Sequence, residues 1–370
     1  MTTALSAVDP SFQFVAGHDQ LDQLLSELIR RGGSDLHLTA GAPPAMRLDG
    51  ELQPTPGWPV LSPADTERII RSALNDQQWH SFCDENELDT AYSVPDVSRF
   101  RLNVYRQRGS IGAAFRSIPQ KIKSLHELGV PASIEQFAHL PRGLVLVTGP
   151  TGSGKSTTLA SLLDVANKTR AGHIVTIEDP IEYLHRHGKC IVNQREVGVD
   201  TANFASALRR VLRQDPDIIL VGELRDLETT SVAITAAETG HLVLATLHTQ
   251  SAASTIDRLI DIYPPNQQQQ IRAQLANCLQ GVVTQALAPR MNGGRVVVCE
   301  IMVATSAIRN LIREGKVHQI PTFLQSSADV GMLSFDQHLA QRYTEQLISQ
   351  YDALEIAHDQ AEFRRLARLM

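Results

Sequence analysis

Apolar residues recur along this chain with two different periods. In "DQLDQLLSELIRRGG", leucines and an isoleucine fall on one helical face, and two glycines end the predicted helix. The segments "SDLHLTAG" and "AMRLDGEL" alternate as short strands, and a helical pattern covers 63–82. "RFRLNVYRQRGSIGAAFRSIP" predicts a β-hairpin that turns at Arg108 and Gly109. Together these segments predict a small α+β domain over 17–118, preceded by a loose tail over 1–16.

After a linker predicted over 119–135, strands alternate with helices. The predicted strands are "LVLVTG", "HIVTIED", "DIILVGE" and "HLVLATLH", and helical patterns lie between and after them. This alternation is typical of a largely parallel, doubly wound α/β sheet. The stretch from about residue 267 is expected to be mainly helical, and the whole predicts a second domain over 136–370.

A glycine-rich turn joins the first of these strands to the following helix, in the pattern G-x-x-x-x-G-K-[ST]. Glycines let successive N–H groups point inward at an anion, and the helix presents its positive end to the same place. Lys155 can reach the β- and γ-phosphates of a nucleotide, and the Ser156 hydroxyl can bind Mg²⁺. The nucleotide-binding residues that the motif predicts are Gly149, Pro150, Thr151, Gly152, Ser153, Gly154, Lys155, Ser156 and Thr157.

Acids and imidazoles follow the other predicted strands, and active groups gather at the carboxyl ends of parallel strands. Glu178 and Glu182 follow "HIVTI", where one carboxylate can position an attacking water. Glu223 ends "IILVG", where a carboxylate of the Mg²⁺ shell belongs, although Asp is the usual residue there. His248 follows "LVLAT" and is placed to sense the γ-phosphate. His241 begins that strand, and the pattern leaves open whether it is structural or part of the site.

The hairpin turn sets a register that places Arg101 directly opposite Arg116. Like charges in this position destabilise a sheet, so the pair suggests an anion that needs both guanidiniums. Because the small domain lacks the phosphate-binding loop, that anion would be the nucleotide of a neighbouring subunit, where an arginine supplied in trans accelerates hydrolysis. The alternative is a solvated strand face compensated by acidic neighbours, and the pattern favours neither.

The amino-acid composition limits the kinds of partner and cofactor that we expect this chain to bind. The 370 residues include 34 Lys and Arg against 40 Asp and Glu, a net charge of −6, and only 5% are aromatic, which argues against nucleic acid as a partner. The four cysteines are scattered without a C-x-x-C pair, which predicts free thiols and no zinc site. Neither a signal peptide nor an apolar run of membrane-spanning length is present, so we expect a cytoplasmic protein.

Several motifs resemble one family. "GPTGSGKSTTLA", "TIEDPIEY", "NQREVG", "ALRRVLRQDPDIILVGELRDLET" and "AAETGHLVLATLHTQSA" are similar to the ATPases of the type II/IV secretion superfamily. Within that superfamily, "AIRNLIRE" resembles the signature of the pilus retraction ATPases, the twitching-motility PilT family. The likeness runs from about residue 17 to the C-terminus.

The resemblance implies a homohexameric, ATP-hydrolysing motor with Mg²⁺ that powers pilus retraction and twitching motility. Each subunit would pair a PAS-like N-terminal domain with a RecA-like P-loop core. The motor would sit at the inner face of the cell membrane, at the pilus base, against an inner-membrane platform protein. A paralogous pilus ATPase is a further possible partner.

The resemblance also implies residue roles. Glu182 would be the general base of an acidic box that also holds Glu178 and Asp179. The other implied elements are a Walker B segment ending at Glu223, a His box from His241 to His248, arginine fingers Arg101 and Arg116, and a retraction helix with Arg309, Asn310 and Arg313. In that helix an apolar stripe is expected to be buried and the arginines exposed.

Three other functions are alternatives to pilus retraction. An assembly-type or type II secretion ATPase of the same superfamily is the nearest alternative; assembly-type members usually carry an extra N-terminal domain and a four-cysteine zinc site, which this chain lacks. A nucleotide-gated scaffold with little hydrolysis is disfavoured by the acids at 178, 182 and 223. A DNA motor is disfavoured by the acidic balance.

Overall fold

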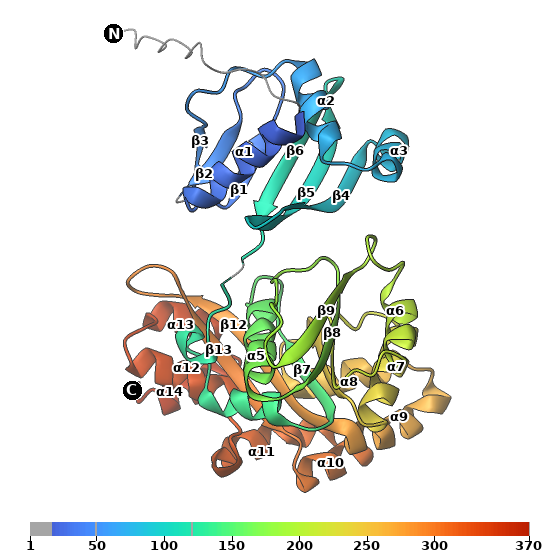
Figure 1. The fold of residues 1–370 in the computed structure, drawn as a ribbon. Helices are drawn as coiled ribbons and strands as arrows, with labels where there is room; N and C mark the ends of the chain where they lie inside the picture. Colours follow the sequence, from blue (N-terminus) through green and yellow to red (C-terminus); the bar gives the residue numbers. More distant parts are fainter. Residues whose placement is uncertain (1–16, 49, 120, 370) are drawn as a thin grey trace. The chain divides into compact units, whose positions relative to one another are not determined.

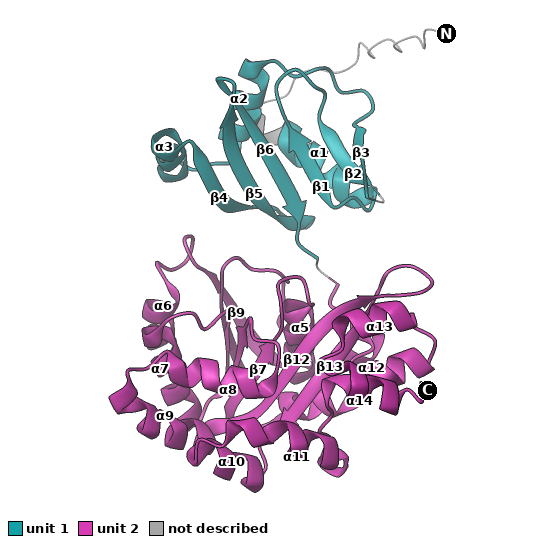
Figure 2. Cartoon of the chain, turned by 180° about the vertical axis from the view of Figure 1, so that it is seen from behind, with its two compact units in different colours: residues 1–120 teal, residues 121–370 magenta. Residues whose placement is uncertain are grey.

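The chain forms two compact units, residues 1–120 and 121–370 (Figures 1 and 2). The computed structural model describes three stretches of the chain, 17–48, 50–119 and 121–369. The predicted tail over 1–16 lies outside the described residues.

The first unit is a six-stranded antiparallel sheet with helices packed on it. The strand order is β3-β2-β1-β6-β5-β4, with the strands β1 Asp35–Leu38, β2 Ala45–Leu48, β3 Glu51–Pro54, β4 Glu87–Val94, β5 Ser98–Gln107 and β6 Ser110–Ser117. The helices are α1 Gly17–Arg30, α2 Pro63–Ser72 and α3 Asp76–Glu85. As the periodicity predicts, α1 buries one apolar face, made of Leu21, Leu24, Leu25 and Leu28.

The predicted hairpin is β5 and β6. Arg108 has φ 47° and Gly109 has φ 77°, the positive values that a tight two-residue hairpin turn requires. The register places Arg101 opposite Arg116, which confirms the predicted pairing. On the other side of β6, Asp35 of β1 lies opposite Arg116, so an acidic residue adjoins the arginine pair within the sheet.

The second unit contains a seven-stranded sheet in which every strand but β13 runs parallel. The order is β13-β12-β7-β11-β10-β8-β9, with the strands β7 Gly143–Thr148, β8 Gly172–Glu178, β9 Cys190–Glu196, β10 Ile218–Val221, β11 Leu242–Leu247, β12 Leu279–Pro289 and β13 Arg295–Val303. The central strands β7, β10 and β11 are buried along their whole length, which is why their sequences are continuous apolar runs.

Helices cover the two faces of this sheet (Figure 1). One face packs on α4 Leu125–Leu128, the 3₁₀ segment η1 Ala132–His139 and α5 Lys155–Thr169. The other face packs on α6 Phe204–Val211, α7 Leu227–Glu238, α8 Ala252–Asp261, α9 Pro265–Cys278, α10 Ser306–Arg313 and α11 Ile320–Ser326. A separate apolar cluster joins β12 and β13 to α12 Phe335–Thr344, α13 Gln350–Ile356 and α14 Gln360–Leu366.

Two parts of the structure differ from the expectation. The stretch beyond 267 is helical over most of its regular structure, as expected, but it also contains β12 and β13, two long strands that pair beside β7 inside the sheet and were not predicted. The segment predicted as a linker over 119–135 belongs to the second unit from Lys121 on. Its Leu125 is buried against the same face of the sheet as α5, so packing, which local composition does not reveal, assigns it to the unit.

A buried carboxyl ties the sheet to α8. Glu300 of β13 is only 6% exposed, and its Oε1 accepts the N–H of Ala252, the first residue of α8, at 2.7 Å. The pKa of Glu300 is raised to about 7, mainly by burial; the hydrogen bond from Ala252 opposes the rise, and nearby Asp336 adds to it. The carboxyl therefore binds its proton more tightly in the folded chain than in the unfolded one.

The Glu300→Gln substitution is expected to weaken the pH dependence of stability. The stability that protonated Glu300 contributes is fully present below the ordinary pKa and is lost as pH rises to about 7, a difference of roughly 3 kcal/mol at most. Urea unfolding of wild type and variant at pH 5 and pH 8 measures this. Glu355→Gln, at an exposed glutamate, is the control, and a wild-type pH dependence in Glu300→Gln would contradict the expectation.

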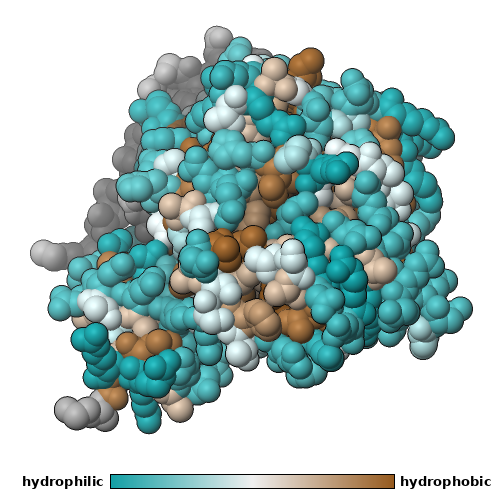
Figure 3. All heavy atoms as spheres, turned by 90° about the horizontal axis from the view of Figure 1, so that it is seen from below, coloured by the Kyte–Doolittle hydropathy of each residue, from teal (hydrophilic) through white to brown (hydrophobic). Residues whose placement is uncertain are grey.

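The surface is largely hydrophilic on the face that Figure 3 shows, where apolar side chains gather only in small patches. Among the described residues, no helix combines the length and the apolar character needed to cross a membrane.

Candidate active site

The predicted phosphate-binding loop joins β7 to α5. Gly149 has φ 137°, and a Cβ there would lie 2.1 Å from the carbonyl oxygen of Gln285, so only glycine fits. Lys155 begins α5, and its Nζ donates to the carbonyl oxygens of Gly149 at 2.8 Å and Pro150 at 3.0 Å. Burial lowers the pKa of Lys155, and the Glu223 carboxylate opposes that change. The ammonium is thus held at the turn, beside the start of the helix.

Strand β12 supports this loop from behind. Gln285 is 2% exposed, and its Nε2 donates to the carbonyl oxygen of Ser153 at 2.9 Å. One residue earlier, the Thr284 hydroxyl pairs with that of Thr148 at 2.8 Å. The shape of the loop therefore depends on a strand residue that lies 132 positions further along the chain than Ser153.

The Gln285→Met substitution is expected to weaken nucleotide binding. Methionine fills a similar volume but makes no hydrogen bond to Ser153, and a hydrogen bond of this kind contributes about 1 kcal/mol, so we expect an ADP affinity lowered by roughly fivefold to tenfold. Calorimetric titration with ADP measures it. Gln274→Met, which removes an exposed hydrogen bond from α9 to Glu238, is the control, and an unchanged affinity in Gln285→Met would show that the loop holds its shape without the Ser153 contact.

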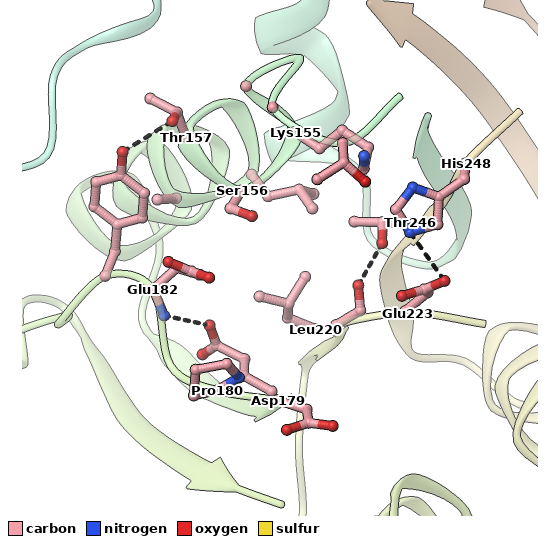
Figure 4. A pocket seen from close by; sticks show the side chains of 18 of the residues that line it. Lys155, Ser156, Thr157, Asp179, Pro180, Glu182, Leu220, Glu223, Thr246 and His248 are labelled. Carbon is pink, nitrogen blue, oxygen red and sulfur yellow. Dashed lines mark hydrogen bonds and ion pairs between the residues drawn. The ribbon is translucent and has the colours of Figure 1, made fainter. Parts of the chain in front are cut away.

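A pocket of about 580 Å³ opens in front of the loop (Figure 4). The predicted loop lines it with Thr151, Gly152, Gly154, Lys155, Ser156 and Thr157. The segments that follow β8, β10 and β11 line it with Glu178, Asp179, Glu182, Glu223 and His248. Gly149, Pro150 and Ser153 shape the turn but do not line the pocket. The structure thus brings the loop and the strand-end groups to one place, as the topology rule predicts.

The two glutamates after β8 differ in exposure. Glu178 is 8% exposed, and its Oε1 accepts the hydroxyl of Thr176 at 2.6 Å. Burial raises the pKa of Glu178. Glu182, by contrast, is exposed, and its side chain lies in the pocket near Ser156 (Figure 4). Both glutamates line the pocket, but Glu178 is nearly buried, so Glu182 is the one with more access to a water molecule.

Glu223 is held in an ionised network. Its carboxylate lies 2.7 Å from the Arg225 guanidinium and 3.1 Å from His248 Nε2. Burial by itself raises the pKa of Glu223, but the contacts with Arg225 and His248 outweigh it and leave the pKa below its usual value. A carboxylate that stays ionised suits a place in the shell of a divalent cation. The contact between His248 and Glu223 links the ends of the neighbouring strands β11 and β10.

His241 lies outside the pocket. It precedes β11 at the amino end of the parallel strands, where Leu242 is opposite Gly143, the first residue of β7. Its Nδ1 lies 3.0 Å from the carbonyl oxygen of Ala236 at the end of α7. Because the phosphate-binding loop follows the other end of β7, the geometry supports the structural interpretation of this histidine.

Arg101 and Arg116 belong to the first unit. The Nε of Arg116 donates to Asp35 Oδ1 at 2.8 Å, while 69% of the Arg116 side chain is exposed. Burial raises the pKa of Asp35, but hydrogen bonds from Ser34 and Arg116 keep it below its usual value. The acidic compensation weighed above is therefore present for Arg116, because Asp35, only 6% exposed, accepts a hydrogen bond from its guanidinium.

The predicted retraction helix is α10, and none of its residues lines the pocket. Its apolar stripe of Ile308, Leu311 and Ile312 is buried, as expected. Arg309 is not an exposed arginine: its guanidinium donates to the carbonyl oxygens of Ala304, Ala276 and Asn277 and to Gln280 Oε1. It therefore satisfies the last carbonyls of α9. Asn310 and Arg313 are exposed.

Sequence reasoning missed several residues that line the pocket, namely Tyr183, His185, Phe204, Arg225, Thr246, Leu287 and Arg295. Arg225 and Thr246 lie at strand ends, where the rule used for Glu223 and His248 would have found them. Leu287 and Arg295 come from β12 and β13, so the expectation of a helical C-terminal part concealed them.

The sequence profile of a family described as "Type II/IV secretion system protein" matches residues 114–351. The chain belongs to this family. It is 49% identical over 337 residues to "Type IV pilus retractation ATPase PilT" of Pseudomonas aeruginosa, covering 91% of this chain and 98% of that protein. It is 41% identical over 351 residues to "Type IV pilus ATPase PilU" of the same organism, covering 95% and 92%.

Solved structures agree with this membership of the type II/IV secretion family. The crystal structure of "the Pilus Retraction Motor PilT and Bound ADP" matches with a TM-score of 0.87 and 48% identity over 93% of this chain and 98% of that chain. The Legionella pneumophila ATPase DotB matches with a TM-score of 0.81 and 26% identity, over 94% and 98%. The predicted fold, a RecA-like doubly wound core with a smaller α+β domain, is confirmed. The chain is a nucleotide-using ATPase of this family.

Proposed function

We propose that this ATPase powers type IV pilus retraction as a homohexameric motor on the cytoplasmic side of the pilus base. The observation that carries the proposal is the 49% identity that spans 98% of the P. aeruginosa PilT chain, together with a pocket that holds the hydrolytic groups. The α10 helix with "AIRNLIRE" adds to it. The platform protein of the inner membrane would be the partner that receives the work.

The pocket residues fit ATP with Mg²⁺. The N–H groups of the loop and Lys155 would bind the β- and γ-phosphates, and Ser156 with Glu223 nearby would hold the cation, whose charge would neutralise the phosphate oxygens. Glu182 would orient the attacking water and accept its proton. His248, in contact with Glu223, would respond to the state of the γ-phosphate.

Arg101 and Arg116 would act on the nucleotide of a neighbouring subunit. In this proposal ATP closes an interface between the second unit of one subunit and the first unit of the next, and Arg116 exchanges Asp35 for phosphate. Hydrolysis releases the pair, and the units rotate. Successive closures around the ring would withdraw pilin into the membrane.

A deletion strain scored for piliation and twitching tests the proposal. We expect cells that keep pili but do not move, because assembly continues without withdrawal. Bald cells would indicate an assembly motor instead. A steady-state phosphate-release assay on the purified chain separates a motor from a nucleotide-gated scaffold, which would bind ATP and release little phosphate.

The structure shows which arginine of α10 is suitable for a test of this helix. We expect Arg313→Ala to leave ATP turnover within about twofold of wild type but to abolish twitching, since Arg313 is exposed on a helix remote from the pocket. Turnover by the purified variant and motility of cells carrying it give the two readouts. Arg309→Ala is unsuitable, because it would remove the hydrogen bonds that the Arg309 guanidinium donates to the carbonyl oxygens of Ala276 and Asn277 at the end of α9. Loss of turnover in Arg313→Ala would contradict the separation of α10 from catalysis.

A second candidate is a retraction ATPase that works only beside a paralogue. The 41% identity to PilU over 95% of this chain supports this second candidate. Turnover by the purified chain alone, with twitching that also requires a second pilus ATPase, would indicate this arrangement.

A further inference from the structure

The segment that carries Glu182 has no regular secondary structure of its own. We call residues 179–185, between β8 and the turn before β9, the Glu182 loop. An irregular segment makes few backbone hydrogen bonds within itself, so its shape depends on groups supplied from elsewhere. The position of the Glu182 carboxylate in the pocket is therefore decided by whatever binds this loop.

Gln194 of β9 binds the loop on the far side of Glu182. Its Oε1 accepts the N–H of His185 at 2.8 Å, and its Nε2 donates to the carbonyl oxygen of Tyr183 at 2.8 Å. The same Nε2 also donates to Glu178 Oε1 at 3.1 Å. One carboxamide thus joins the end of β8 to two backbone groups of the loop.

Other contacts hold the near side and the flank of the loop. Glu196, two residues beyond Gln194 and 2% exposed, accepts the N–H of Ile181 at 3.1 Å. The Tyr183 hydroxyl pairs with that of Thr157 in α5 at 2.8 Å. The loop is consequently held on both sides of Glu182, at residues 181, 183 and 185. The N–H of Glu182 itself lies 3.5 Å from Glu178 Oε2, at the end of β8.

We propose that Gln194 is a positioning residue for hydrolysis: its carboxamide sets the Glu182 loop so that the Glu182 carboxylate faces the attacking water. Gln194 does not line the pocket, so it acts through the loop and not on the nucleotide. The inference rests on the role proposed above for Glu182. Positioning matters because a shift of about 1 Å in a catalytic group lowers a rate roughly 100-fold.

The position in the sheet explains why β9 can do this. β9 is parallel to β8, with Gln194 opposite Thr176 and Glu196 opposite Glu178, so both residues lie beside the strand end from which the loop departs. Residues 194 and 196 are two positions apart along the strand, so their side chains lie on the same face of the sheet. Asn193 lies on the opposite face, where its amide contacts His173.

The test compares two matched substitutions on neighbouring residues of β9. Gln194→Met keeps the length of the side chain and removes its three hydrogen bonds. Asn193→Leu keeps a similar size and removes the contact with His173 on the opposite face. For Gln194→Met we expect kcat for ATP hydrolysis to fall roughly 10- to 100-fold, with KM for ATP and ADP affinity within about threefold of wild type. Asn193→Leu should retain wild-type kcat. Wild-type kcat in Gln194→Met, or an equal fall in Asn193→Leu, would overturn the proposal.

A second comparison separates positioning from a general loss of structure. In a Glu182→Gln background, adding Gln194→Met should lower the remaining kcat by less than about twofold, since the group that Gln194 positions is already disabled. A full additive loss would overturn the proposal. A weakened ADP affinity in Gln194→Met that matches its loss of kcat would do the same.

Other results of these experiments would show which of the proposals is wrong. If Gln194→Met does not fold, Gln194→Asn, a smaller polar change whose amide is too short to reach the loop, takes the same measurements and the same criteria. If the wild-type chain releases no phosphate, or Glu182→Gln keeps full turnover, the proposed function or the role of Glu182 is at fault. If Glu182→Gln is inactive and Gln194→Met is not impaired, the inference about Gln194 alone is wrong.

Discussion

Lys155→Ala is expected to abolish ATP turnover while leaving the fold intact. The Lys155 ammonium is held at the phosphate-binding loop by two carbonyl oxygens, so it is already in place for the β- and γ-phosphates. Removing a donor that stabilises developing charge lowers kcat by roughly 10²–10³ or more. Alanine suits the start of a helix, and the loop keeps its contacts with β12.

Phosphate release by the purified variant measures this loss, and the same helix provides a matched control. Lys168 lies near the end of α5, is exposed and pairs with Asp164 four residues earlier. Lys168→Ala should retain turnover within about twofold, since an exposed helical ion pair contributes only about 0.3–0.5 kcal/mol. Turnover by Lys155→Ala above about a tenth of wild type would mean that this lysine does not act on the transferred phosphate.

Arg101→Ala is expected to lower turnover by roughly 10³-fold, the lower end of the effect of an arginine supplied in trans. The expectation follows from the antiparallel pairing of Arg101 with Arg116 in a unit that lacks the phosphate-binding loop. If the arginine acts on the next subunit, two inactive chains should complement each other. An interface between an Arg101→Ala subunit, which keeps Lys155, and a Lys155→Ala neighbour, which keeps Arg101, has both groups.

Co-expression of the two variants measures this complementation. About a quarter of the interfaces in a randomly mixed ring would contain both groups, and mixed rings should recover a comparable share of turnover. Arg108→Asn at the turn of the same hairpin is the control, because asparagine tolerates the positive φ of 47° there. Mixed rings that stay as inactive as either variant alone would show that the arginine does not serve a neighbouring site.

Much of the site could be predicted because its groups follow buried strands. A strand covered on both faces is visible as an apolar run, and the polar residue that ends it is visible as well, so Glu182, Glu223 and His248 were found with the loop. The hairpin register was predictable for a similar reason, since a two-residue turn at Arg108 and Gly109 leaves only one pairing.

Long-range packing decided the rest. The apolar run of β12 is as compatible with a buried helix as with a strand, and only its pairing with β7 makes it part of the sheet. The support that Gln285 gives the loop follows from that pairing, and it could not be expected while the segment was taken as helical. Likewise, the helical pattern of α10 showed two arginines, but not that Arg309 reaches the end of α9.

By itself, the sequence determined the fold class, the phosphate-binding loop, the acids and imidazole that follow the strands, and the pairing of Arg101 with Arg116, because each depends on local spacing or on the period of a single element. Only the tertiary structure decided that Glu178 is buried and Glu182 faces the pocket, that Arg116 contacts Asp35, and that Gln194 and Gln285 hold the loops of the site. These depend on side chains that meet across strands and helices far apart in the chain, and such meetings are set by how the elements pack and not by the order of residues within any one of them.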